Sequence, residues 1–264
     1  MDAIASTLPA PTTTATPRFR RWLPYWAVLQ TDLRQTLRSW VYRLWVVVSI
    51  LAAVGYLLYR FGVHREAGMI QSASLHTSDL LRGIVLGSMA LIVVLSVSSI
   101  PTERGTLADS VMSRGISRYQ YYMAKWHART IAIVATFAVI AAFVLLGSYL
   151  LLSEDLTFTG SLVAVATIAV ALAAIVAWGV TLGALSNSTV VGITILWIIL
   201  YGIGFVMTFL PASYPSPERI LKRLPYMLQG HYDINALGEL TVISLGLMLI
   251  AAIVGMVGFS RKDV

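Results

Sequence analysis

The amino-acid sequence predicts an all-α integral membrane protein with six transmembrane helices. Of its 264 residues, 58% are hydrophobic and only 12% are charged, whereas soluble domains carry about 25% charged residues. Six apolar stretches also approach the roughly 20 residues that a helix needs to cross a bilayer. A chain of this length has room for one helical bundle but not for a separate soluble catalytic domain.

Two segments precede the first span. Residues 1–17 are rich in Thr, Ala and Pro, and we expect them to form a disordered cytoplasmic tail. Residues 18–43 mix aromatic and basic side chains, which predicts an amphipathic helix along the membrane interface, with an ordinary juxtamembrane extension as the alternative. Residues 44–264 would then form the six-span domain. At helical spacing, one stripe of the interfacial helix collects Trp22, Trp26, Leu29, Leu33, Leu37 and Trp40.

The six predicted spans contain no Asp, Glu, Lys, Arg or His. Carriers coupled to protons or ions usually keep an ionisable residue inside the membrane, and many have matched, broken spans in two inverted halves. Neither feature is present, so a secondary carrier or channel is disfavoured. An intramembrane enzyme is disfavoured too, because no span holds a base for a nucleophile. The predicted spans are Leu44–Tyr59, Gly83–Ile100, Thr130–Leu152, Leu162–Leu185, Val190–Leu210 and Leu240–Phe259.

The distribution of basic residues predicts that both termini lie in the cytoplasm. In that orientation most of the 19 Lys and Arg residues fall on the inner side of the membrane, as the positive-inside rule requires. Topology therefore accounts for the formal charge of +7. Nucleic acid is not an expected partner, because basic and aromatic residues do not interleave as they do in proteins that read it. The expected location is the inner (plasma) membrane.

The longest inner polar segment, Pro101–Arg129, lies between the second and third spans and is strongly basic. We expect Thr106–Ser113 to form a short surface helix, Gly115 to break it, and Ser117 to cap a second helix that runs into the third span. A helix–turn–helix of this kind can transmit force from a soluble partner into two spans at once. On charge alone, a solvated positive-inside loop is the competing interpretation.

The longest outer segment, Pro211–Glu239, precedes the last span. Its prolines should end the fifth span, Glu218–Leu224 should form one or two helical turns, and Pro225 should stop them. The residues that follow are apolar enough to dip back into the membrane. A re-entrant turn at Pro225, Tyr226 and Gly230 and a helix on the outer surface are both open, and the two breakers slightly favour the turn.

Several short motifs resemble the permease subunits of ABC-2 type transporters. The first inner loop reads E-x-G-T-L, then M-S-R-G-I-S-R-x-x-Y, then K-W. It is similar to that family's first cytoplasmic loop, with its Glu, Gly-Thr, short helix, Ile-Ser-Arg turn and Lys before the third span. The C-terminal G-F-S-R-K-D-V and the order of spans also resemble the family. Gly115 stands where many relatives have Pro, which should loosen the turn.

The resemblance implies partners and a mechanism. Such permeases pair as homo- or heterodimers and bind two ATPase subunits, and the first-loop helix, called the coupling helix, docks in a groove of the ATPase. This chain has no G-x-x-x-x-G-K-[ST] phosphate loop, so ATP and Mg²⁺ belong on the partner subunit, and we expect no cofactor and no enzyme activity in this chain by itself. The implied docking residues are Glu103, Gly105, Thr106, Asp109, Arg114, Ser117, Arg118, Tyr119 and Lys125.

Other sequence features add packing and metal predictions. Gly179, Gly183 and Ala184 put small residues one helical turn apart, which predicts close helix packing within the chain or at a dimer interface. His76 and Asp79 have the spacing of a metal pair, but a solvated pair is the better interpretation, so no metal site is predicted.

Together these features predict a permease that exports an amphiphilic or lipid-linked compound, because the predicted spans are free of charge. A membrane anchor that recruits a cytoplasmic complex is the main alternative besides a carrier or channel. Membrane lipids are the remaining expected partner.

Overall fold

Every described element of secondary structure in the computed structural model is a helix. The structure describes residues 22–67, 72–101, 116–152, 155–209 and 217–261. Six of the described helices, α2, α3, α5, α6, α7 and α9, are long and apolar enough to cross a membrane. The predicted all-helical class and the six membrane-length helices are therefore confirmed. In chain order the helices are α1 (Leu23–Arg38), α2 (Trp40–Ala67), α3 (Ala73–Val97), α5 (Arg118–Leu151), α6 (Phe158–Leu185), α7 (Thr189–Phe209), α8 (Pro217–Leu228) and α9 (Ile234–Ser260).

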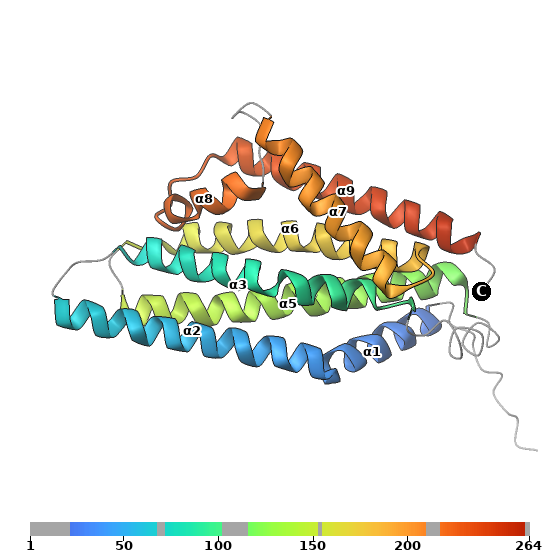
Figure 1. Ribbon diagram of the computed structural model, residues 1–264, viewed down its shortest axis with the longest axis horizontal. Coiled ribbons are helices and arrows are strands. Elements are labelled where there is room, and N and C mark those ends of the chain that lie inside the picture. Colours follow the sequence, from blue (N-terminus) through green and yellow to red (C-terminus); the bar gives the residue numbers. More distant parts are fainter. Residues whose placement is uncertain (1–21, 68–71, 102–115, 153–154, 210–216, 262–264) are drawn as a thin grey trace, which may run out of the picture.

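The long helices run alternately up and down one bundle (Figure 1). Helix α1, the start of α5 and the ends of α3, α6 and α9 lie at one end, drawn on the right, which we call the α1 end. The starts of α3, α6 and α9 lie at the other end together with the short helix α8, and we call this the α8 end. Residues 102–115 connect α3 to α5, so both of their flanking helices meet at the α1 end.

Helix α6 is the centre of the bundle, because it contacts α3, α5, α7, α8 and α9. Its buried face is built largely from small or β-branched residues, among them Ala164, Val176, Ala177 and Val180, which are all fully buried. Side chains this small let neighbouring helices approach closely, and close approach is what holds helices together inside a membrane. Larger side chains such as Phe137 of α5 fill the remaining core.

Several helices extend beyond the predicted spans. Helix α3 begins at Ala73 rather than Gly83, because Ser72 caps it by accepting a hydrogen bond from the Leu75 N–H at 3.4 Å. Asp79 lies on the exposed side of this added length. The predicted span began at Gly83 because polar and charged residues precede it in the sequence. A charged side chain on an exposed face does not end a helix, so α3 includes these residues.

A break at Ser39 separates α1 from α2. Its backbone is extended, with ψ of 141°, its N–H donates to the Thr36 carbonyl oxygen at 3.1 Å, and its hydroxyl accepts from the Tyr42 N–H at 3.3 Å. The chain changes direction there (Figure 1). The predicted interfacial helix of residues 18–43 is thus a separate helix as far as Arg38, and the first membrane-length helix starts at Trp40. The predicted tail, residues 1–17, lies outside the described residues.

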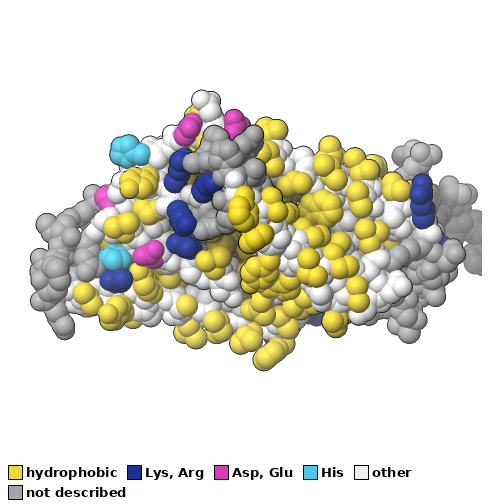
Figure 2. All heavy atoms as spheres, turned by 45° about the horizontal axis from the view of Figure 1, so that its top comes forward, with side chains coloured by type: hydrophobic (Ala, Val, Ile, Leu, Met, Phe, Trp, Pro, Cys, Tyr) yellow, Lys and Arg dark blue, Asp and Glu magenta, His cyan; other side chains and the backbone are white. Residues whose placement is uncertain are grey.

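The surface of the long helices is apolar. Figure 2 shows one face, on which hydrophobic side chains are spread along the bundle while most of the visible Lys and Arg side chains lie toward the left, near acidic and His side chains. Many large apolar residues are exposed, for example Phe205 and Phe209 of α7 at 67% and 75%. Such continuous apolar exposure is far beyond the patches of soluble monomers, and it fits a chain that a lipid bilayer surrounds.

Candidate functional site

A buried ionic cluster joins α1 to α5 at the α1 end. Asp32 of α1 is only 2% exposed. Its Oδ1 lies 2.8 Å from Lys125 Nζ, and its Oδ2 lies 3.0 Å from Arg129 Nε. Arg129 Nη2 also donates to Asp32 Oδ1 at 3.2 Å, whereas Nε and Oδ2 are close enough to attract each other but do not align as a hydrogen bond. We call Asp32, Lys125 and Arg129 the ionic cluster.

The two cations of the ionic cluster also reach the end of α3. Lys125 Nζ donates to the Ser99 carbonyl oxygen at 3.2 Å, and Arg129 Nη1 donates to the Leu95 carbonyl oxygen at 3.3 Å. Carbonyl groups at the end of a helix lack hydrogen-bond donors within the helix. The two cations act as donors to these carbonyl groups. The ionic cluster therefore fixes α1, α5 and the end of α3 to one another. The last two are the helices that flank residues 102–115.

Small residues on α5 make this contact possible. Ala124 and Ala128 are fully buried and pack with Leu29 of α1 in a small apolar cluster. Because a methyl group is all that separates the two helices there, the short Asp32 side chain can reach Lys125 and Arg129. Removing unlike charges from water costs several kcal/mol per ion. The pairing of Asp32 with two cations and the hydrogen bonds from Lys125 Nζ and Arg129 Nη2 offset this cost.

Among the predicted docking residues that the structure describes, Lys125 is the most deeply buried. It is 2% exposed and points at Asp32 and Ser99. The role of Asp32 and its pairing with Arg129 were not predicted from the sequence. One signal was present: Asp32 is the only acidic residue between Asp2 and Glu66, and it lies on the same helical face as Leu29.

The start of α5 carries the other predicted docking residues that are described. Ser117 caps the helix in a capping box with Gln120, which confirms the predicted cap. Arg118 Nη1 donates to the Ser260 carbonyl oxygen at the end of α9, at 3.1 Å. Tyr119 is 54% exposed. The predicted helix Thr106–Ser113 and the residues Glu103, Gly105, Thr106, Asp109 and Arg114 lie outside the described residues.

One turn further along α5, Tyr122 forms a buried polar joint with α6 and α9. Its hydroxyl lies 2.9 Å from the Thr181 hydroxyl, which in turn lies 3.0 Å from the Ala251 carbonyl oxygen. A side chain at Gly255 of α9 would overlap the Tyr122 ring. A displacement of the start of α5 would therefore also displace α6 and α9.

The small residues predicted for close packing lie between helices of the same chain. A side chain at Gly179 would overlap Ser96, and one at Gly183 would overlap the Val97 carbonyl oxygen. Ala184 is fully buried. Gly179 and Gly183 therefore line the contact between α6 and the end of α3, at the same end of the bundle as the ionic cluster.

Helix α8 corrects one prediction at the other end of the bundle. Pro225 does not stop it, and α8 continues to Leu228. An interior proline costs a helix about 3 kcal/mol, but Met227 and Leu228 are buried against the bundle, and burying each contributes roughly 1.5–3 kcal/mol. The helix ends at Leu228, two residues before Gly230, whose φ is +90°.

The end of α8 is a glycine cap held against the start of α6. The Gly230 N–H donates to the Met227 carbonyl oxygen, and the His231 N–H donates to the Tyr226 carbonyl oxygen, both at 2.9 Å. This is the Schellman pattern, which requires a left-handed residue such as glycine. The Thr157 N–H donates to the Leu228 carbonyl oxygen at 2.9 Å, so the cap also fixes α8 to α6.

Asp155, just before α6, completes this connection. Its carboxylate accepts hydrogen bonds from the Ser72 hydroxyl at 2.5 Å, from the Ser74 N–H at 2.8 Å and hydroxyl at 2.7 Å, and from Gln229 Nε2 at 3.2 Å. Partial burial raises the pKa of Asp155, but these hydrogen bonds outweigh it, and the pKa lies below its ordinary value. The carboxylate thus joins the starts of α3 and α6 to the end of α8.

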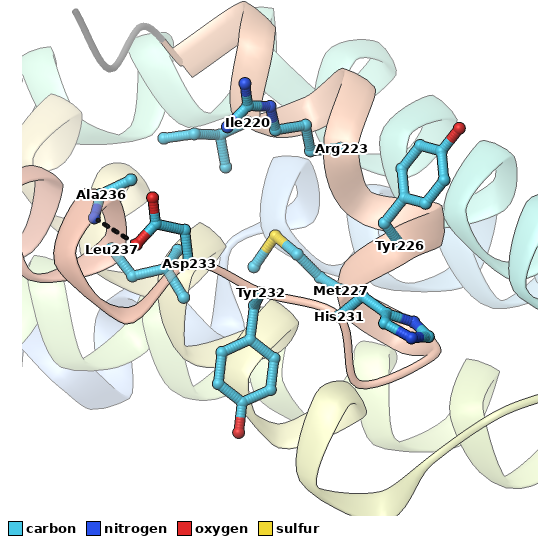
Figure 3. Close-up of a pocket in the computed structure, with 9 residues that line it drawn as sticks. All are labelled: Ile220, Arg223, Tyr226, Met227, His231, Tyr232, Asp233, Ala236 and Leu237. Carbon is cyan, nitrogen blue, oxygen red and sulfur yellow. Dashed lines mark hydrogen bonds between the residues drawn. The ribbon is translucent and has the colours of Figure 1, made fainter. Parts of the chain in front are cut away.

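A shallow cavity of about 350 Å³ separates α8 from the start of α9 (Figure 3). Its Asp233 is already used, because it caps α9 by accepting hydrogen bonds from the Asn235 and Ala236 N–H groups. Arg223 and His231 are exposed. These groups form no arrangement for acid–base or nucleophilic chemistry. The lining residues are Ile220, Arg223, Tyr226, Met227, His231, Tyr232, Asp233, Ala236 and Leu237.

Within the described ranges, no three His, Asp or Glu side chains come together in a way that could hold a metal ion. His76 instead meets Tyr56, with 3.4 Å between the tyrosine hydroxyl and His76 Nδ1. No protein-family model matches this chain, and no curated protein matches its sequence. The candidate site is therefore defined by geometry alone: an ionic cluster that couples three helices at the α1 end.

Proposed function

We propose that this chain is the transmembrane permease subunit of an ATP-binding cassette transporter, in the inner membrane with both termini in the cytoplasm. The ionic cluster is the observation that supports this best. It joins α1, α5 and the end of α3, and the last two flank the segment with the E-x-G-T-L and I-S-R motifs. A partner that pushes on this segment would move three helices as one body.

Two ATPase subunits, one for each permease, would dock on this segment and close on ATP. The push would enter α5 at its capped start. From there the Arg118 bond to α9 and the Tyr122 joint with α6 and α9 would carry it into the bundle. Lys125 would take part as a structural link beneath the docking surface, while Ser117, Arg118 and the exposed Tyr119 would lie at the docking surface itself.

Two copies of this chain, or this chain and a paralogue, would enclose the substrate path. We assign the path to α2, α3 and α7, of which α3 contacts both of the other two. Helix α7 leaves aromatic residues such as Tyr201 and Phe205 exposed at 71% and 67%. An apolar face of this kind suits an amphiphilic or lipid-linked substrate, and we infer export as the direction of transport.

We assign α8 to the outer end of the path as a re-entrant segment. Its apolar side, with Leu224, Met227 and Leu228, is buried in the bundle. Lys222 and Arg223 stay exposed on its other side. Anchored by Gly230 and by the Asp155 hydrogen bonds, it would close the path when the opposite end is open.

Co-purification from gently solubilised membranes tests the proposal. The tagged wild type is compared with a variant that carries Arg114→Glu and Arg118→Glu, and with a control that carries Arg219→Glu and Arg223→Glu. Both variants change the net charge by the same amount, but the control residues lie on α8. A nucleotide-binding polypeptide should follow the wild type and the control and be lost from the first variant.

The other outcomes are equally informative. If the nucleotide-binding polypeptide were lost from both variants, the effect would come from the change in net charge rather than from docking at the α1 end. Failure of the wild type to bring down any nucleotide-binding polypeptide would reject the permease proposal and leave the carrier and anchor interpretations.

A further inference from the structure

A groove of about 400 Å³ runs between α1, α2 and α5. Its wall is apolar, and the two hydroxyl groups in it already have partners. Thr136 Oγ1 donates to the Ala132 carbonyl oxygen at 2.6 Å and lies 2.7 Å from the Tyr42 hydroxyl, which donates to it. Both hydroxyl protons are thus used inside the wall, and the groove presents a surface that suits a hydrocarbon.

The groove has the length of an acyl chain. Its lining on α5 extends from Ile131 to Phe143, which is about 18 Å of helix at 1.5 Å per residue. One leaflet of a bilayer core is roughly 15 Å thick, half of the whole. The groove is open at the side, because Val139 is 69% exposed and Leu37 is 41% exposed, so a lipid chain can enter it from the membrane.

Basic residues stand beside the groove on α1. Arg34 and Arg38 follow the lining residues Leu33 and Leu37 by one position each, are four residues apart and are exposed. They therefore share one edge of the helix, next to the row that lines the groove. Unlike Arg129, whose guanidinium holds Asp32, they point outward, where a phosphate group could meet both.

We propose that this groove binds one acyl chain of an anionic phospholipid and that Arg34 and Arg38 bind its phosphate. The length of the groove, its satisfied hydroxyls and the paired arginines at its edge all fit this one occupant. The bound lipid would fill the space that α1 leaves where it turns away from α2, on the flank of α1 next to the ionic cluster. The proposal requires only that the chain spans a membrane, and it does not depend on the permease function.

Photolabelling of the full-length chain in lipid nanodiscs tests the site. The probe is a phosphatidylglycerol with a diazirine in its acyl chain, and the comparison probe is the matching phosphatidylcholine. Labelling should concentrate on peptides from α1, α2 and α5 that line the groove. Phosphatidylglycerol should label them about tenfold more than phosphatidylcholine, because each basic residue at the surface strengthens the binding of an anionic lipid.

Matched variants separate the two halves of the site. Ala135→Phe places a ring in the groove at an exposed position, and it should reduce labelling by about tenfold, since it occupies the volume that the acyl chain needs. Ala166→Phe, at an exposed position of α6 outside the groove, should leave labelling unchanged. Arg34→Gln with Arg38→Gln should abolish the preference for phosphatidylglycerol, whereas Arg219→Gln with Arg223→Gln should preserve it.

Three outcomes would overturn the proposal. Even labelling of all membrane-length helices, unaffected by Ala135→Phe, would mean bulk lipid contact only. Equal labelling of the wild type by the two probes would show that Arg34 and Arg38 do not select an anionic phospholipid. Cross-links from the groove to a second copy of the chain would show that a protein interface covers it instead.

Discussion

The change Asp32→Asn probes the ionic cluster with almost no change in side-chain shape. It leaves Lys125 and Arg129 buried, with relative side-chain exposures of 3% and 8%, and without their common counter-ion. The amide can still accept a hydrogen bond, but it carries no charge. We expect this single substitution to be among the most destabilising on α1.

The magnitude follows from the distances. Charges 2.8 and 3.0 Å apart attract by roughly 5–6 kcal/mol per pair at an effective dielectric constant of about 20. Desolvation and the repulsion between the two cations offset most of this. Breaking a buried pair from one side typically costs about 3–5 kcal/mol, which corresponds to a fall in Tm of about 10 °C for a chain of this size.

Thermal unfolding of the detergent-solubilised protein measures the effect. Tryptophan fluorescence is a suitable signal, because Trp126 lies one residue from Lys125 and is 8% exposed. The matched control is Asp79→Asn, the same chemical change at an exposed position of α3, which should move Tm by little.

A double variant sharpens the test. Adding Lys125→Met to Asp32→Asn removes one of the two cations that the Asp32 carboxylate holds in the wild type, so the double variant should be less destabilised than the sum of the single changes by roughly 0.5–3 kcal/mol. If Asp32→Asn and Asp79→Asn lowered Tm equally, or if the double variant were simply additive, the ionic cluster would not hold the three helices together.

The remaining predictions concern the packing of α6 and α8. Gly183→Ala should lower Tm by several degrees because its methyl group would overlap the Val97 carbonyl oxygen, whereas Gly246→Ala, with open space around it, should be neutral or slightly stabilising; equal effects in thermal unfolding would contradict the packing. Gly230→Ala should cost about 1 kcal/mol or more, because φ is +90° there, and a normal Tm would argue against the glycine cap. Asp155 has a lowered pKa, so its contribution to stability is present above the ordinary carboxyl pKa of about 4 and is lost as pH falls through the folded value. Asp155→Asn should therefore be less stable at neutral pH and should lose less stability than wild type on acidification, and parallel pH profiles of Tm would refute this.

The sequence predicted the features that depend on local composition. Hydropathy marks a membrane-length helix because each residue contributes to it independently of the others, so all six were found. The cap at Ser117 was also predictable, since the hydroxyl acts on a backbone only a few residues away. The limits of α3 were not, because an apolar stretch ends at the first charged residue while the helix itself continues.

Features that depend on which helices contact each other could not be predicted from the sequence. Asp32 and Lys125 are 93 residues apart in the chain, and pairing them requires knowledge that α1 lies on α5 at Ala124 and Ala128. Pro225 is the opposite case, where a strong local rule was overridden by the burial of Met227 and Leu228 on the bundle. The proposal that residues 102–115 dock a partner rests on the sequence motifs of that segment.

Site-specific cross-linking in native membranes tests the proposed function most directly. The chain has no cysteine, so a single introduced thiol reports from one place only. Tyr119→Cys puts it at an exposed position near the start of α5, and Ile234→Cys, at a position that is 72% exposed, puts it at the opposite end as a control. A bifunctional reagent should join the first variant, and not the second, to a polypeptide that binds ATP. If no nucleotide-binding polypeptide is captured by the thiol at position 119, the chain is not the permease of an ATP-driven transporter.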